Sequence, residues 1–275
     1  MDAARLPDNA ADLLAWYGEM GVDVALDDEA PNRFAESSMA DSAPAPGGRA
    51  LPTLESLRAP APVSPAAEAT PAQAEAVADA RMRAAGATSL DELRAILETY
   101  DGVALRKTAT RLVFADGNPE ARLMFVGEAP GKDEDRAGLP FVGRAGQLLD
   151  RMLAAIGLDR SQVYIANIVP WRPPGNRKPT AQESELCLPF ARRQIELVNP
   201  DVLVLLGGTS TSALLGVEGI MRQRGKWHEY DIGGRTVPAL PTLHPAFLLR
   251  TPAQKKFAWR DFRAIKAALD AQTRN

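Results

Sequence analysis

Residues able to take part in chemistry gather in four short segments of this 275-residue chain. These segments are GEAPGKDEDRAGLPFVGRAG (127–146), NIVPWRPPGNRKPT (167–180), GGTSTSALLG (207–216) and LHPAFLLR (243–250). In the first segment, Gly127 and Gly131 bracket a tight turn whose backbone N–H groups can bind a carbonyl or anionic oxygen. No GK[ST] follows this turn and the dinucleotide fingerprint is absent, so the sequence predicts neither kind of phosphate-binding loop.

Side chains suited to a planar base and to phosphates occupy the first two segments. Phe141 lies in a glycine-flanked loop, where an aromatic ring can stack on a base or, alternatively, fill the core. Asn167 offers a donor and an acceptor, the pair that the uracil edge (N3–H and O4) requires; the alternative is an asparagine that caps a turn. Arg172, Arg177 and Lys178 follow on a stiff proline-rich loop that suits phosphates.

Carboxylates and histidines complete the candidate chemistry. Glu128 and Glu134 lie in the first segment, either in a site or solvated on a surface turn. The chain has two histidines. His228 lies in GKWHEYDIGG, which predicts a surface hairpin, whereas His244 follows a predicted strand and precedes a proline. Its position beside the other polar segments favours a functional role for His244.

Four short apolar runs indicate the strands that position these segments. They cover residues 123–126, 163–169, 202–206 and 237–240. Helical patterns lie between the runs, and this alternation predicts an α/β fold with a parallel sheet covered by helices on both faces. Ligands in such sheets bind at the carboxyl ends of the strands. Because each polar segment directly follows one run, the sequence predicts that the four segments form one site.

The N-terminal region differs in composition from the rest of the chain. Residues 1–75 carry 4 Lys and Arg against 13 Asp and Glu, a net charge of −9, and the remaining residues carry 28 against 22, a net charge of +6. The basic part suits a polyanionic partner, although a charge of this size is also ordinary. We expect a short acidic amphipathic helix segment in 1–30, an Ala/Pro-rich disordered linker in 31–80 and a folded domain in 81–275.

Composition also excludes several classes of protein. No run of 18 apolar residues occurs, and the acidic N-terminus does not fit a signal peptide, so a soluble cytoplasmic protein is expected. The chain has one cysteine, Cys187, which excludes a disulfide framework and any metal site built from several thiolates.

Three of the segments together resemble one known family. Residues 127–146, the run ending in Asn167 with RPPGNR-x-P, and LHP-x-x-LLR are similar to the motifs of the family 4 uracil-DNA glycosylases, over roughly 88–270. The resemblance implies a three-layer α/β/α sandwich around a four-stranded parallel sheet. It also implies a DNA repair hydrolase that flips uracil out of DNA, cleaves its N-glycosidic bond and leaves an abasic site for base excision repair.

The resemblance assigns roles to residues that match the family motifs. The catalytic residues that it implies are Glu128, Glu134 and His244. The residues that it implies for binding uracil are Ala129, Phe141, Asn167, Asn176 and His244. Those expected to contact DNA are Arg172, Arg177, Lys178, Leu248 and Arg250, with Leu248 as the wedge that fills the vacated base stack. The histidine would stabilise charge on the departing base, and a carboxylate would orient water.

One departure from the family concerns its cofactor. Family members usually carry four cysteines that bind a [4Fe–4S] cluster, and the matching positions here are Tyr100, Val103, Trp171 and Cys187. One thiolate cannot hold such a cluster, so no cofactor and no metal are expected. The loop PPGNRKPT also lacks the histidine with which related enzymes trap DNA covalently, which predicts ordinary turnover.

Partners and alternatives follow from the same resemblance. We expect a monomer that acts on uracil in single- and double-stranded DNA, with a protein partner for the N-terminal helix and no membrane. One alternative is a non-catalytic, polymerase-associated DNA-binding module. Another is a glycosylase for a different deaminated base, such as hypoxanthine. Residues 1–80 are expected to be dispensable for the chemistry.

Overall fold

Alternate residues of the buried strands face opposite sides of one sheet. The structure is a computed structural model that describes residues 71–272. Its sheet has six strands in the order β1-β3-β2-β4-β6-β5. The strands are β1 (Asp116–Gly117), β2 (Leu123–Gly127), β3 (Val163–Asn167), β4 (Val202–Leu206), β5 (His228–Asp231) and β6 (Thr236–Thr242). The four runs predicted from the sequence are therefore β2, β3, β4 and β6.

These four strands form the parallel centre of the sheet. β2 pairs in parallel with β3 and β4, and β4 pairs in parallel with β6. Two antiparallel edge strands extend this centre: β1 pairs with β3, and β5 forms a hairpin with β6. The predicted parallel α/β sheet is thus confirmed. The edge strand β1 was not predicted, because a strand of two residues leaves no recognisable pattern in the sequence.

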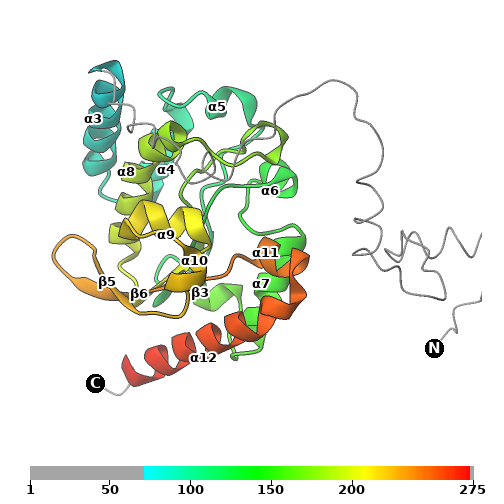
Figure 1. The fold of residues 1–275 in the computed structure, drawn as a ribbon. Helices are drawn as coiled ribbons and strands as arrows, with labels where there is room; N and C mark the ends of the chain where they lie inside the picture. The colour runs from blue at the N-terminus through cyan, green and yellow to red at the C-terminus, as the bar shows by residue number, and fades with distance from the viewer. Residues whose placement is uncertain (1–70, 273–275) are drawn as a thin grey trace, which may run out of the picture. The chain divides into compact units, whose positions relative to one another are not determined.

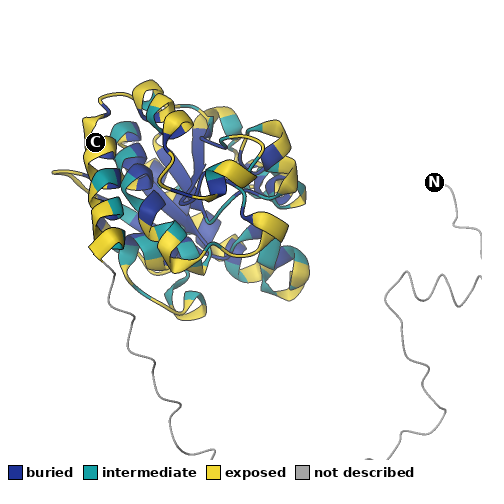
Figure 2. Ribbon diagram, turned by 90° about the horizontal axis from the view of Figure 1, so that it is seen from above, coloured by how far each residue is buried: buried dark blue, intermediate teal, exposed yellow. Residues whose placement is uncertain are grey.

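Helices cover both faces of the sheet, as Figures 1 and 2 show. The α-helices are α3 (Pro71–Gly86), α4 (Leu90–Thr99), α5 (Leu105–Thr108), α6 (Lys132–Ala137), α7 (Arg144–Ala154), α8 (Ala181–Val198), α9 (Gly208–Leu215), α10 (Ile220–Gln223), α11 (Pro245–Arg250) and α12 (Lys255–Gln272). Short 3₁₀ turns are η2 (Arg160–Gln162), η3 (Pro174–Asn176) and η4 (Pro252–Gln254). Met124 and Val126 of β2 pack in the cluster with α3, α4, α8 and α9, whereas Leu123 and Phe125 pack with α7 and α12. This alternation makes the three-layer α/β/α sandwich.

The described fold begins ten residues before the predicted domain boundary at residue 81. Helix α3 buries Val77, Ala80 and Ala84 in the cluster that also contains α8. The predicted disordered linker is therefore corrected at 71–80, which are helical, and a chain that starts near residue 81 would lose the packing of Val77 and Ala80. That residues 1–80 are dispensable for the chemistry stays a prediction. The sequence signal was weak there, because Ala-rich helices share their composition with Ala/Pro-rich linkers. The predicted helix in 1–30 and the rest of the predicted linker lie outside the described residues.

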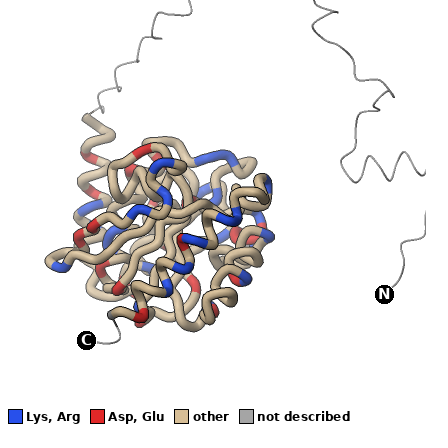
Figure 3. The backbone as a smooth tube through the Cα atoms, turned by 60° about the horizontal axis from the view of Figure 1, so that its bottom comes forward, with Lys and Arg blue, Asp and Glu red and all other residues tan. Residues whose placement is uncertain are grey.

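The register of the parallel strands aligns their carboxyl ends. Gly127 at the end of β2 pairs with Asn167 at the end of β3, and Leu206 of β4 pairs with Thr242 of β6. The four polar segments therefore start at one edge of the sheet, as predicted. Figure 3 shows basic and acidic residues interspersed over the folded part in this view.

Candidate active site

A cavity of about 200 Å³ lies at the carboxyl edge of the sheet. All seven residues singled out from the sequence as catalytic or base-binding line it. Its lining comprises Glu128, Ala129, Pro130, Gly131, Glu134, Phe141, Ala145, Asn167, Asn176, Arg177, His244 and Ala246. A larger groove of about 900 Å³ shares Glu128, Ala129, Asn176 and His244 with the cavity, so the two are continuous.

The ring of Phe141 forms one wall of the cavity. Phe141 is only 5% exposed, and its ring centroid lies 5.4 Å from that of His244. A Cβ atom on Gly127 would stand 2.7 Å from Cζ of Phe141 and 2.4 Å from Oδ1 of Asn167. Only glycine therefore allows the ring and the amide to meet over the end of β2. Phe141 has φ of 54°, a conformation that costs a non-glycine residue about 1–3 kcal/mol and that its surroundings must impose.

Asn167 presents a buried amide to the same space. The residue is 5% exposed and lines the cavity. Its Oδ1 is buried and accepts no hydrogen bond from any residue in the described range. Leaving a buried acceptor unpaired costs about 1–3 kcal/mol, so such an atom in a cavity indicates a ligand that donates a hydrogen bond to it. The N3–H group of uracil is a donor of this kind.

His244 is a half-buried imidazole that is neutral near pH 7. It forms the N-cap of α11, and its Nδ1 accepts a hydrogen bond from the backbone N–H of Ala246 at 3.1 Å. The proton of the neutral ring therefore lies on Nε2, which makes Nε2–H the donor. Burial lowers the pKa of His244 to about 4, and the charge of Arg250 acts in the same direction. His244 can thus donate a hydrogen bond to a developing negative charge without carrying a positive charge itself.

The lowered pKa of His244 predicts that acid destabilises the native protein. Below pH 6.5 the unfolded chain gains a proton on this histidine, whereas the native state remains neutral down to about pH 4. The contribution of His244 to the free energy of unfolding is therefore fully present above pH 6.5. It is lost as the pH falls from 6.5 to 4, which lowers the free energy of unfolding by up to about 3 kcal/mol. Urea unfolding at pH 7.5 and 4.5 measures this loss. A His244→Asn variant should lose less stability over the same interval, and an equal loss in both proteins would contradict the assignment.

Glu128 is held by a residue that sequence analysis did not single out. The hydroxyl of Thr209, in the first turn of α9, donates a hydrogen bond to Oε2 of Glu128 at 2.5 Å. Thr209 lies in the third polar segment, for whose side chains the sequence predicts no individual roles. The contact spans 81 residues of sequence, so only the folded chain reveals it. It fixes the direction of the Glu128 carboxylate at the border between cavity and groove.

Glu134 lines the cavity, but its carboxylate bonds to backbone. Oε1 accepts from the N–H groups of Val142 at 3.1 Å and Gly143 at 2.9 Å, and Oε2 accepts from the N–H of Gly131 at 3.1 Å. Both oxygens are thereby engaged in fixing the turn that carries Phe141. This geometry suits a residue that shapes the site better than one that activates water.

The proline-rich loop is stiffened by contacts between its own side chains and neighbouring ones. Nε of Arg172 donates to Oδ1 of Asn176 at 2.7 Å, and its guanidinium lies 3.9 Å from the buried carboxylate of Asp135. Arg177 forms a bidentate pair with Glu183, and this hydrogen bonding lowers the pKa of Glu183 to about 2. The charges of both arginines are therefore already paired.

The larger groove contains the other predicted DNA contacts, apart from Leu248. Lys178 and Arg250 line it and are exposed. Leu248 is completely buried in a cluster with Leu148 and Leu243, a position that does not favour the predicted wedge, and its role in DNA binding stays a prediction. In PAFLLR several apolar residues could point inward, and packing against α7 selects Leu248. The preceding residue, Phe247, is half-buried and lines the groove.

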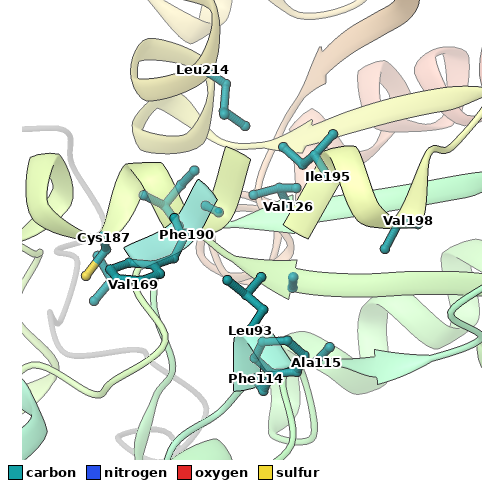
Figure 4. Close-up of a cluster of buried hydrophobic side chains, with 14 of the residues drawn as sticks. Leu93, Phe114, Ala115, Val126, Val169, Cys187, Phe190, Ile195, Val198 and Leu214 are labelled. Atoms are coloured by element: carbon teal, nitrogen blue, oxygen red, sulfur yellow. The ribbon is translucent and has the colours of Figure 1, made fainter. Parts of the chain in front are cut away.

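The four positions matched to cluster cysteines lie together in the core. Tyr100, Val103, Trp171 and Cys187 are each at most 2% exposed and belong to one hydrophobic cluster. Figure 4 shows Cys187 beside Val169 and Phe190 among apolar side chains. Burial raises the pKa of the Cys187 thiol, so it stays protonated. With one sulfur among the four residues, the positions do not fit an iron–sulfur cluster. Within residues 71–272, no group of three His, Cys, Asp or Glu side chains could hold a metal ion.

The chain is similar to known proteins of one superfamily. Over the described residues, none of the helices combines the length and apolar character needed to cross a membrane. The sequence pattern of the Uracil DNA glycosylase superfamily matches residues 114–263. A type-4 uracil-DNA glycosylase of Saccharolobus solfataricus is 42% identical over 174 residues, which cover 61% of this chain and 81% of that protein. The type-4 uracil-DNA glycosylase of Archaeoglobus fulgidus is 41% identical over 182 residues, covering 64% and 92%. That of Thermotoga maritima is 44% identical over 147 residues, covering 53% and 76%. The chain therefore belongs to the uracil-DNA glycosylase superfamily, and within it to the type-4 uracil-DNA glycosylases.

Proposed function

We propose that the cavity at the carboxyl edge of the sheet binds a uracil flipped out of DNA, and that the protein hydrolyses the N-glycosidic bond of this nucleotide. The protein is a uracil-DNA glycosylase, a DNA N-glycosylase that starts base excision repair and leaves an abasic site. One observation supports the choice of base above all others. Asn167, whose buried Oδ1 lacks a partner in the described chain, lines a cavity walled by an aromatic ring.

Three side chains would hold the base. The ring of Phe141 stacks on the uracil plane, as aromatic side chains do on bases. The amide of Asn167 accepts from N3–H and donates to O4. His244 donates from Nε2 to O2, where negative charge collects as the base departs, and a donor already in place there needs no rearrangement. Cytosine carries an amino group at C4 and an unprotonated N3, so the same amide orientation rejects it.

Hydrolysis requires a water molecule on the sugar side of the base. We assign its activation to Glu128, because Thr209 directs this carboxylate and both oxygens of Glu134 are engaged with backbone. The C1′–N1 bond breaks and its electron pair leaves with uracil, spread over N1 and O2. The water oxygen bonds to C1′, and its proton passes to the Glu128 carboxylate. The sequence predicted both glutamates as catalytic, and we now propose only Glu128 for this step.

DNA would lie along the larger groove. Extruding a base costs a few kcal/mol, which contacts to the backbone and to the vacated stack must offset. Lys178 and Arg250 line this groove and suit phosphates, and Phe247 offers an apolar side chain from α11. We propose that the protein acts as a monomer on both single- and double-stranded DNA.

An excision assay tests the proposed function. Oligonucleotides that carry uracil, hypoxanthine or thymine opposite guanine are incubated with the purified protein in EDTA and then treated with alkali, which cleaves at abasic sites. We expect cleavage at uracil in single and double strands and none at thymine. Intact uracil oligonucleotides would refute the proposal, and faster cleavage at hypoxanthine than at uracil would identify a different substrate.

We also propose that this protein works without an iron–sulfur cluster. Apolar packing supports the idea. Tyr100, Trp171 and Phe190 belong to one buried hydrophobic cluster, in which the ring centroids of Tyr100 and Phe190 lie 4.9 Å apart. Trp171 directly precedes the loop that carries Arg172, so its ring can anchor that loop in the core without metal.

Replacing Trp171 by alanine should therefore destabilise the protein by about 3–5 kcal/mol, because its fully buried ring would leave a cavity. Urea unfolding measures this change. Cys187→Ala serves as the control, and it should cost far less and leave excision unchanged. The purified protein should show no absorbance band near ~400 nm, and elemental analysis should find no iron. Stoichiometric iron, or loss of activity in Cys187→Ala, would contradict the proposal.

A further inference from the structure

The backbone of Phe141 is held in its left-handed conformation by partners on both sides. Glu134 accepts hydrogen bonds from the N–H groups of Val142 and Gly143, which follow the ring. On the carbonyl side, the guanidinium of Arg160 donates to the oxygen of Phe141, and to that of Pro140 at 3.2 Å. A positive φ at an aromatic residue persists only under such constraint.

Arg160 is itself fixed by two carboxylates. Its Nη1 lies 2.5 Å from Oδ2 of Asp116 in β1, and its Nε lies 2.7 Å from Oδ1 of Asp150 in α7. Arg160 belongs to η2, directly before β3, and is not among the residues that line the cavity. The planar guanidinium can bond to two carbonyls and two carboxylates at once, which a lysine cannot do.

Close packing against α7 completes this arrangement. A Cβ atom on Gly146 would lie 1.6 Å from the carbonyl oxygen of Phe141, so the turn rests directly on the first turn of the helix. Asp150 is on the same helix one turn later. The Phe141 carbonyl is therefore enclosed between the glycine and the arginine, and the backbone that carries the ring cannot leave its conformation without breaking these contacts.

We propose that Arg160, oriented by Asp116 and Asp150, is a positioning residue for catalysis: it sets the plane of the Phe141 ring on which uracil stacks. This role rests on the proposed function of the cavity. Arg160 touches neither base nor water, and it acts only through Phe141. The rival explanation is that the arginine merely ties β1, η2 and α7 together and contributes stability alone.

A double-mutant cycle separates the two explanations. The kcat, KM and Tm are measured for the wild type, Arg160→Ala, Phe141→Ala and the double variant. We expect Arg160→Ala to lower kcat about 10- to 100-fold, since misplacing a positioning group by about 1 Å has effects of this size. KM should change little, because phosphate contacts dominate DNA affinity. In the Phe141→Ala background, the same substitution should change kcat less than about 2-fold while still lowering Tm.

Two further variants sharpen the test. Arg193→Ala is the matched control, because Arg193 also donates two hydrogen bonds to a backbone carbonyl, that of Ala87, and pairs with Glu196. It should lower Tm without changing kcat. Arg160→Lys should recover only part of the lost kcat. Equal effects of Arg160→Ala with and without the Phe141 ring, or an unchanged kcat, would overturn the proposal.

A crystal structure of Arg160→Ala distinguishes this inference from the proposed function. We expect Phe141 to leave its positive φ and its ring to turn out of the cavity wall. If wild-type protein excises uracil but Phe141 keeps its conformation in the variant, the inference is wrong and the function stands. If the wild type excises nothing, the function is wrong, and the conformation of Phe141 in the variant alone decides whether Arg160 positions the ring.

Discussion

Replacing His244 by asparagine is expected to lower kcat for uracil excision by about 100- to 1,000-fold, the range seen when one donor to a developing oxyanion is removed. The Nε2–H donor is lost, whereas asparagine can still cap α11 as the Nδ1 of His244 does now. The fold should therefore survive the change. Single-turnover kinetics on a uracil oligonucleotide measures kcat, and a thermal melt confirms that the variant is folded.

His228→Asn is the matched control, because this histidine lies in the edge strand β5 outside the cavity. It should excise uracil at the wild-type rate. The neutral state of His244 adds a second expectation: the wild-type rate should not rise as the pH falls from 8 to 6, since the imidazole gains no charge above about pH 4. A His244→Asn variant within a few-fold of wild type would remove the histidine from the site.

Asn167→Asp is expected to lower uracil excision by about 10- to 100-fold. The aspartate cannot donate to O4 when ionised, and a polar contact left unpaired in a buried site costs about 1–3 kcal/mol. Excision rates on the same oligonucleotide measure the effect, and a thermal melt shows whether the variant is still folded.

A matched asparagine far from the cavity provides the control. Oδ1 of Asn118 accepts a hydrogen bond from the N–H of Glu120 at 2.9 Å in a surface turn, a role that aspartate also fills. Asn118→Asp should therefore leave excision unchanged. Wild-type activity in Asn167→Asp would show that uracil binds elsewhere or is recognised by other groups.

Much of the site could be predicted because its parts are local in the sequence. Apolar runs identified the central strands, and the residues after each run could only emerge at one edge of a parallel sheet. Residue type then limited the chemistry: Asn167 is an amide at a strand end, His244 precedes a proline, and Phe141 lies between glycines. The lack of cysteines at three positions matched to a cluster was likewise visible in the sequence.

The tertiary structure decided which groups are paired and which are available, because hydrogen bonds and burial depend on residues distant in the chain. Glu128 and Glu134 lie in the same polar segment, and the sequence predicts both as catalytic. In the structure, Glu128 accepts a hydrogen bond from Thr209, whereas Glu134 accepts hydrogen bonds from three backbone N–H groups. In PAFLLR, packing against α7 buries Leu248 and leaves Phe247 at the groove. Burial keeps His244 neutral. These outcomes are set by distances between elements that no local pattern contains.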